Sequence, residues 1–170
     1  MYVFDLDLNK MEKKFVDFKI PEGRGDIKMI KKFNKKFKFI DESYNANPLS
    51  MSSSITNMNF FKRKKNEKKI VLLGDMLELG DKSKKFHKAL SVVINKSDID
   101  KVFVYGRDIR ETYNSLSTNK KGKVFNNLQE AYNHFSKILH NNDLLMVKGS
   151  NATGLNQFSK NIKKGQTSAI

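Results

Sequence analysis

Hydrophobic and polar positions follow two periods along this chain, one typical of buried strands and one typical of helices that cover them. Continuous apolar runs, such as 69–73 and 143–147, indicate strands that are buried on both faces. Between the runs, apolar residues recur every three or four positions, which is typical of helices with one buried face. The predicted strands are 27–33, 37–40, 69–73, 101–105, 123–125 and 143–147, and the predicted helices are 48–61, 82–96, 109–116, 128–139 and 155–162.

This alternation of strands and helices predicts the fold class. Strands that alternate with helical segments indicate βαβ units. Such units build an α/β domain with a Rossmann-like, mainly parallel sheet and helices on both faces. The first two strands are separated only by a short "NKK" turn, so the first strand is expected to pair antiparallel in a hairpin.

The N-terminal segment has a pattern of its own. Its apolar residues have helical spacing, and Asp7 is a suitable N-cap for a helix over 7–18. The sequence "IPEGRGD" then breaks the pattern. One amphipathic helix has nothing to bury its apolar stripe against. We therefore predict two segments, residues 1–24, which are foreign to the main domain, and residues 25–170.

Composition narrows the class of protein. The 170 residues suffice for one domain with a real core, and the absence of cysteine fits a reducing compartment. No apolar run approaches the ~20 residues of a membrane span, and the acidic start is unlike a secretory signal. These features predict a cytoplasmic protein without a membrane span.

The net charge of +15 invites a nucleic-acid interpretation, but its make-up argues against one. The basic residues are nearly all lysine, whereas base recognition usually depends on the bidentate fork of arginine. The dense run at 62–69 falls between a helix and a strand, as a solvated loop does. We interpret the charge as compositional and expect no nucleic-acid partner, although a positive field would favour anionic substrates.

Polar residues and glycines follow four of the predicted strands. These stretches are Asp41–Asn47, Gly74–Gly80, Gly106–Asp108 and Lys148–Asn151. In an open α/β sheet, ligands bind beyond the carboxyl ends of the strands. The four stretches therefore predict a ligand-binding rim at one edge of the sheet.

Each rim residue also has a simpler explanation. Asn47 or Asp81 could cap a helix, and Asp75 and Glu78 could be first-turn acids favoured by the helix dipole. His87 fits a packed or capping histidine better than a base. Caps alone do not require the tyrosine and the lysine found at these strand ends. With three dispersed histidines and no cysteine, no metal site is expected in the chain itself.

Phosphate-cradling loops are missing from the printed sequence. It contains no GxxxxGK[ST] motif, and no strand is followed by GxGxxG. If a nucleotide binds here, its phosphates are expected to be held mostly elsewhere.

Three blocks, in this order and spacing, carry a family resemblance. "DESYNANPLSM", "VLLGDMLELG" and "VKGS" closely resemble the C-terminal domain of the Mur ligase family. The "GRG" at 23–25 is similar to the hinge that leads from the central ATP-binding domain of these enzymes. By this resemblance, residues 1–24 are the end of that central domain, and residues 25–170 are the C-terminal domain.

The resemblance implies an ATP-dependent amide ligation of peptidoglycan synthesis. ATP phosphorylates the carboxylate of UDP-MurNAc-tripeptide, and the amine of D-Ala-D-Ala attacks the acyl phosphate. In this family the P-loop and the magnesium ligands lie in the central domain. The resemblance therefore implies that this chain holds no catalytic residue, does not bind Mg²⁺ alone and needs the missing N-terminal and central domains as partners. It is expected to be a fragment or one half of a split enzyme.

The family also implies roles for residues on one side of the rim. Arg24 and Asp41 match positions that face the phosphates or ribose of ATP. Tyr44, Asn45 and Asn47 match a block that lines the junction of the ATP and amino-acid sites.

Four further residues match positions near the incoming dipeptide. Lys148 and Ser150 belong to the strand-end motif of that site, and a lysine there could pair with the dipeptide carboxylate. Asp75 and Glu78 match the GDMLELG block, which the resemblance also places near the dipeptide.

The pattern departs from the family just after "KGS". Relatives often continue with arginine and then a Met-Glu pair, where this chain has Asn151 and Leu155-Asn156. Two alternatives to the ligase stay open at this point. One is a noncatalytic nucleotide- or polyanion-binding module on the same fold, because fold does not fix function. The other is a domain like that of folylpolyglutamate synthase.

Overall fold

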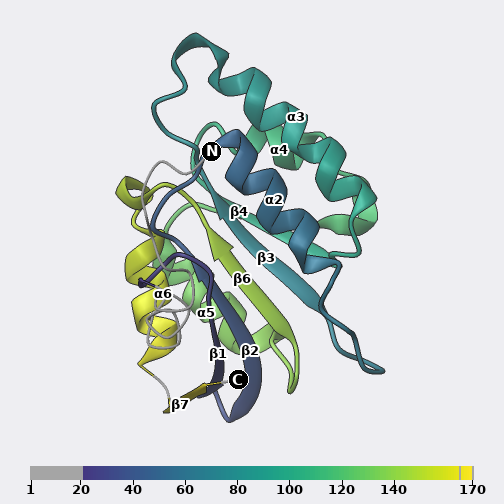
Figure 1. Cartoon of the computed structure of the whole chain (residues 1–170), viewed down its shortest axis with the longest axis vertical. Helices are drawn as coiled ribbons and strands as arrows, with labels where there is room; N and C mark the ends of the chain where they lie inside the picture. The colour runs from purple at the N-terminus through teal and green to yellow at the C-terminus, as the bar shows by residue number, and fades with distance from the viewer. Residues whose placement is uncertain (1–20, 165, 170) are drawn as a thin grey trace, which may run out of the picture.

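The computed structural model describes residues 21–164 and 166–169, which form a seven-stranded sheet covered by helices (Figure 1). The predicted helix over 7–18, and with it most of the predicted N-terminal segment, lies outside the described residues. The strand order is β5-β4-β3-β6-β2-β1-β7. The strands are β1 Asp26–Lys32, β2 Lys35–Glu42, β3 Lys69–Gly74, β4 Lys101–Tyr105, β5 Lys121–Phe125, β6 Leu144–Lys148 and β7 Gln166–Ala169.

Five neighbouring strands, β5, β4, β3, β6 and β2, pair in parallel, which confirms the predicted mainly parallel sheet. The two central strands β3 and β6 are buried at every position. Their sequences, KIVLLG and LLMVK, are the continuous apolar runs expected for strands covered on both faces.

The predicted hairpin of β1 and β2 is present, but its turn lies one residue earlier than "NKK". Lys32 pairs with Lys35, so the two central turn residues are Phe33 and Asn34, both with positive φ (57° and 58°). Two positive φ angles are typical of a type I′ turn, which matches the twist of a hairpin. The ring of Phe33 packs edge-on against the ring of Tyr132, with 5.1 Å between the ring centroids. This contact explains why an apolar residue occupies the turn.

Helices cover both faces of the sheet, as the alternating pattern predicted (Figure 1). Helices α2, α3 and α4 build one core with residues such as Met51 and Ile94, while α5 and α6 build the other with Phe135 and Phe158. No helix in the described ranges is both long and apolar enough to cross a membrane. The helices are α2 Pro48–Met58, α3 Ser83–Lys96, α4 Arg110–Asn114, α5 Leu128–Ile138 and α6 Leu155–Lys163, with 3₁₀ turns η1 Gly80–Lys82, η2 Thr118–Lys120 and η3 Asn151–Thr153.

The structure shifts several element boundaries by a few residues and adds one strand. Helix α2 ends at Met58 and not at 61, because the chain turns there into the basic loop that leads to β3. Helix α4 is only five residues long. Strand β7, which pairs antiparallel with β1, was not predicted, because its short polar sequence QTSA has no apolar pattern.

Candidate functional site

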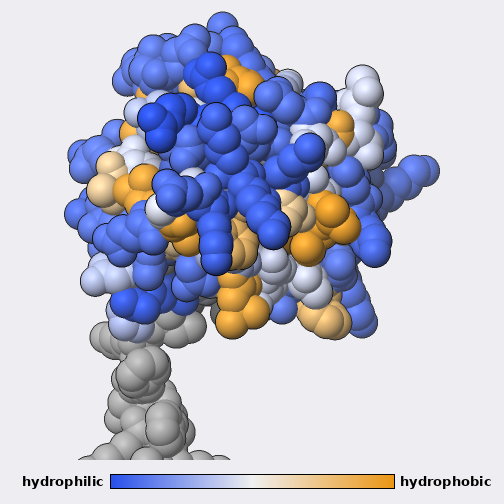
Figure 2. Space-filling view, turned by 90° about the horizontal axis from the view of Figure 1, so that it is seen from above, coloured by the Kyte–Doolittle hydropathy of each residue, from blue (hydrophilic) through white to orange (hydrophobic). Residues whose placement is uncertain are grey.

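The carboxyl ends of β2, β6, β3 and β4 lie side by side in the sheet, so the four predicted polar stretches meet at one rim. Figure 2 views the molecule from this end and shows apolar side chains scattered among hydrophilic ones. Three hollows open along the rim, of about 390, 570 and 470 Å³. We call the first the hinge hollow, because Pro21–Gly23 line it. The second is the arginine hollow, lined by Arg107 and Arg110, and the third is the asparagine hollow, lined by Asn45 and Asn47.

Arg24 and Tyr44 lie together beside the hinge hollow, which Tyr44 lines. The Arg24 guanidinium lies over the Tyr44 ring, 4.2 Å from its centroid, and both side chains are exposed. The Tyr44 N–H donates to the Gly23 carbonyl (3.1 Å), which ties the hinge to the loop after β2. Gly23 has a φ of +75°, and a Cβ there would lie 2.9 Å from the Tyr44 nitrogen, so glycine is required.

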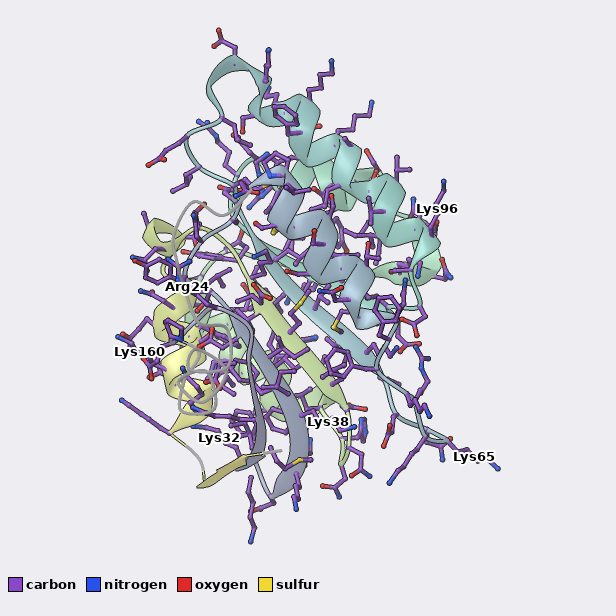
Figure 3. The ribbon with its side chains drawn as sticks, viewed as in Figure 1. Arg24, Lys32, Lys38, Lys65, Lys96 and Lys160 are labelled. Atoms are coloured by element: carbon purple, nitrogen blue, oxygen red, sulfur yellow. The ribbon has the colours of Figure 1, made fainter. Side chains whose placement is uncertain are left out.

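Asp41 lies on the wall of the hinge hollow, with its carboxylate already held. Its Oδ1 accepts from the Ser43 hydroxyl (2.6 Å), and its Oδ2 lies 2.7 Å from the Lys163 ammonium. Burial works against the charged form of Lys163, but the hydrogen bond and charge of Asp41 outweigh it and raise the pKa of this lysine. Lys160, one turn earlier on α6, lines the same hollow, and Figure 3 shows it on the same side of the molecule as Arg24.

Neither of these two α6 lysines was among the site residues predicted from the sequence. Their spacing of three residues, on the helix that follows the "KGS" strand end, was the available signal, because it places both ammonium groups on one helix face. Asp41, the partner of Lys163, lies more than a hundred positions earlier in the chain, so no local pattern connects the two.

Lys148 is buried beneath the rim, with only 2% of its surface exposed. Its ammonium lies 3.1 Å from Glu42 Oε2 and donates to the Asn45 carbonyl, also at 3.1 Å. Glu42 and Lys148 are register partners of β2 and β6, which explains why the two side chains meet. Lys148 thus holds the loop after β2 in place, and its cation is already paired within the protein.

Asp75 likewise supports a loop. Its two carboxylate oxygens accept from the backbone N–H groups of Arg107 (3.0 Å) and Ile109 (2.7 Å) in the loop after β4. Gly106 in that loop has a φ of +144°, and a Cβ there would lie 2.4 Å from Asp75 Oδ1. The close approach of backbone and carboxylate depends on this glycine.

The asparagine hollow contains five of the predicted site residues, Tyr44, Asn45, Asn47, Glu78 and Ser150. The side chain of Asn47 accepts from Ser50 N (2.8 Å) and caps α2, so its capping explanation is confirmed. Asn45 is exposed, and its side-chain oxygen accepts a hydrogen bond from the Ala46 N–H (2.8 Å).

Glu78 and Ser150 play different roles in this hollow. Glu78 is exposed and has a positive φ of 64°, which turns the loop after β3 over the hollow. Ser150 is 6% exposed, and its hydroxyl accepts from the Leu77 N–H at 3.0 Å, so it fastens that loop to the end of β6.

His87 is fully buried and ties α3 to the rim. Its Nε2 accepts from the Met76 N–H (3.0 Å), and its Nδ1 lies 2.8 Å from the Ser83 carbonyl, so Nδ1 carries the proton of a neutral ring. The prediction of a packed histidine is confirmed. The suggestion that Asp81 caps a helix is wrong, because neither η1 nor α3 has a side-chain cap.

The arginine hollow contains two cationic residues that the sequence analysis did not select. Arg107 and Arg110 line it together with Asn126 and Thr153. The Arg107 side chain is 91% exposed, and its hydrogen bond with the neighbouring Asp108 raises the pKa of its guanidinium. The signal was the sequence "GRDIR", which places two of the four arginines of the chain directly after β4.

The described ranges contain no group of three or more His, Cys, Asp or Glu side chains that could hold a metal ion. The rim instead offers exposed cations, the exposed carboxylates of Glu22 and Glu78, and amide groups. This combination suits an anionic or zwitterionic organic ligand.

An open, mainly parallel sheet with hollows beyond its strand ends defines an α/β domain of the Rossmann-like kind. The family model "Mur ligase, glutamate ligase domain" matches residues 27–151. The chain belongs to the Mur ligase family, as a C-terminal domain.

Individual relatives agree with this assignment. The UDP-N-acetylmuramoyl-tripeptide–D-alanyl-D-alanine ligase of Rickettsia prowazekii is 28% identical over 152 residues, which cover 89% of this chain and 32% of that ligase. The ligase of the same name from Bacillus subtilis is 44% identical over 68 residues, 40% of this chain and 14% of that ligase. This chain therefore spans at most about a third of the length of these relatives.

The solved structures show the same fold. The crystal structure of a MurF ligase from Thermotoga maritima in complex with ADP superposes with a TM-score of 0.72 at 22% identity. The superposition covers 92% of this chain and 36% of that one. The predicted fold class is thus confirmed.

Proposed function

We propose that this chain is the C-terminal domain of an ATP-dependent ligase that joins D-Ala-D-Ala to UDP-MurNAc-tripeptide through an acyl phosphate. The observation that carries the proposal is the convergence of four polar strand ends on one rim, in a domain whose relatives are named for that reaction. In this proposal the domain closes over ATP and positions the dipeptide. The N-terminal and central domains supply the phosphate loop and the magnesium ligands.

The hinge hollow suits a portion of ATP. The Tyr44 ring and the Lys160 side chain line it, and the exposed Arg24 guanidinium, stacked on the Tyr44 ring, adds a second cation beside it. Such groups can bind phosphate oxygens or a nucleoside. Asp41 acts indirectly, because its carboxylate pairs with Lys163 at the wall of the hollow and favours the charged form of this lysine.

The asparagine and arginine hollows suit the dipeptide, which carries a carboxylate and an amine. Leu77 and Ala152 line both hollows, so the two are adjacent. The exposed Glu78 can orient the amine, and the guanidinium groups of Arg107 and Arg110 can bind the carboxylate. Ser150, Lys148 and Asp75 belong to the dipeptide site through the loops that they hold.

The isolated chain is expected to hydrolyse no ATP and to ligate nothing. Acyl-phosphate formation needs the phosphates and Mg²⁺ held in line with the acceptor, and the printed sequence has no P-loop motif for this task. The measurement is phosphate release with tripeptide substrate, D-Ala-D-Ala, ATP and Mg²⁺. Turnover well above background from the pure chain would contradict the proposed division of labour.

A chimeric enzyme tests the proposal itself. Residues 21–170 would replace the C-terminal domain of the Bacillus subtilis relative, and formation of the pentapeptide product would be followed by mass spectrometry. We expect ligation that depends on D-Ala-D-Ala, because the grafted rim supplies the dipeptide site. Binding of the UDP-linked substrate to the retained domains is the control for folding. A chimera that binds this substrate but ligates nothing would contradict the proposal.

A further inference from the structure

The positive charge of this protein is concentrated at the end of the sheet opposite the rim, where the parallel strands begin. We call this the basic end, and it consists of 31–38, 59–69, 96–101, 120–121 and 137–143. It carries sixteen lysines and arginines and four carboxylates, whereas the other described residues carry thirteen and ten. Figure 3 shows members of this end, from three separate segments, lying away from the hinge and α6: Lys38, Lys65 and Lys96.

This distribution changes the interpretation of the charge. A compositional excess of lysine, tolerated wherever the surface is solvated, would spread over the whole surface. A field that attracts nucleotides would be strongest at the rim, yet the described residues outside the basic end are close to balanced in charge. The basic end therefore needs an explanation that is separate from the ligand hollows.

The loop that joins α2 to β3 forms the most exposed region of the basic end, and the protein holds it in a defined shape. Phe61 packs partly against the core, and Arg63 donates to Asp100 (3.0 Å) and to the Asp98 carbonyl. The Glu67 carboxylate accepts from Lys64 N (2.8 Å) and closes a turn. These contacts fix the loop at both sides of its basic stretch.

The same loop presents an aromatic ring to solvent. Phe60 is 79% exposed, although the neighbouring Phe61 turns toward the core. Beside Phe60 in the chain are four exposed lysines whose ammonium groups contact no other side chain or carbonyl of the described residues, Lys62, Lys64, Lys65 and Lys68. An exposed ring next to unpaired ammonium groups matches a surface that is anionic outside and apolar beneath.

From this arrangement we infer that the basic end docks on an anionic lipid bilayer. The lysines meet the phosphate head groups as point charges, and Phe60 enters the boundary between head groups and acyl chains. Charge complementarity commits the surface to a membrane and not to a nucleic acid, because arginine, the usual base-reading residue, occurs here only as Arg63, which is already paired. The rim points the other way, so its hollows stay open while the protein is docked. This inference does not depend on the proposed ligase activity.

Co-sedimentation of the chain with lipid vesicles tests the role of charge. We expect binding to vesicles of phosphatidylcholine mixed with phosphatidylglycerol, none to pure phosphatidylcholine, and weakening by salt. The variant in which Lys62, Lys64, Lys65 and Lys68 are all glutamine should bind about a thousandfold more weakly, because four surface charges are lost. The control variant carries the same charge change on four exposed lysines near the start of α3, on the rim side: Lys82, Lys84, Lys85 and Lys88. This control should bind the vesicles nearly as tightly as the parent does.

A second pair of variants tests the role of the aromatic ring. Phe60→Ala should weaken vesicle binding about tenfold, because one ring leaves the interface. Leu49→Ala is the matched control, since Leu49 is equally exposed (78%) at the opposite end of α2, and it should change little. Equal losses in both lysine sets would show that only net charge matters and would overturn the proposal. So would an unchanged affinity of Phe60→Ala, or binding to a single-stranded RNA oligonucleotide that is tighter than binding to the vesicles.

Discussion

Replacing Lys148 by methionine should lower the free energy of unfolding of this chain by about 3 kcal/mol. Lys148 is 2% exposed, and methionine fills its stem but removes the ammonium. The Glu42 carboxylate, 24% exposed, then loses its cation, and the Asn45 carbonyl loses its donor. Removing one partner of a largely buried pair leaves the other charge uncompensated, which costs more than the pair itself contributed. Urea unfolding followed by circular dichroism gives the value.

Two controls separate this pair from a general loss of charge. Lys28→Met breaks the ion pair with Asp26 (2.8 Å), which is on the surface, so it should cost below about 1 kcal/mol. The double variant Lys148→Met with Glu42→Gln should recover much of the lost stability, because no unpaired charge remains. If Lys148→Met costs no more than Lys28→Met, the buried pair does not hold the loop after β2.

The same substitution in the chimeric ligase distinguishes two ways in which Lys148 could serve the dipeptide. A direct contact with the dipeptide carboxylate predicts a Michaelis constant for D-Ala-D-Ala that rises roughly tenfold to a hundredfold, with that for ATP nearly unchanged. A lysine that acts through the loop after β2 affects both constants, because this loop lines the hinge hollow as well as the asparagine hollow. The contacts of Lys148 with Glu42 and Asn45 favour the second outcome.

Gly106→Ala should destabilise the chain by about 4 kcal/mol. The φ of +144° is strained for any residue with a Cβ, and the new methyl group would lie 2.4 Å from Asp75 Oδ1. To make room, the carboxylate must leave the N–H groups of Arg107 and Ile109. The substitution therefore combines backbone strain with the loss of two charge-assisted hydrogen bonds, and it is measured by urea unfolding.

Gly80→Ala is the matched control for Gly106→Ala. Gly80 also has a positive φ, +53°, but a Cβ there meets no atom within 4 Å, so only backbone strain of about 1–2 kcal/mol is expected. In an Asp75→Ala background, Gly106→Ala should likewise cost only its strain, because the atom that it displaces is gone. Equal costs for the two glycines in the parent chain would contradict the role given to Asp75.

The sequence by itself determined the order of the elements, the parallel core of the sheet and the positions of the four polar strand ends. These features depend on local periodicity, because a strand buried on both faces must be apolar throughout and a covering helix must be apolar on one side. The capping of α2 by Asn47 is equally local, since the cap and the N–H that it satisfies are three residues apart. The short polar strand β7 has no such pattern, and only its pairing with β1 defines it.

Only the tertiary structure decided which rim residues stay exposed and which hold one another. Lys148 meets Glu42 because β2 and β6 pair in a particular register, although the two residues lie 106 positions apart in sequence. Likewise, the Asp75 carboxylate accepts a hydrogen bond from the loop after β4, and the Asp41 carboxylate pairs with Lys163 of α6. The concentration of lysines at the basic end has the same origin, because it arises from five segments that come together only when the strands align in parallel. Long-range pairing is set by the packing of the whole core, and no local pattern contains it.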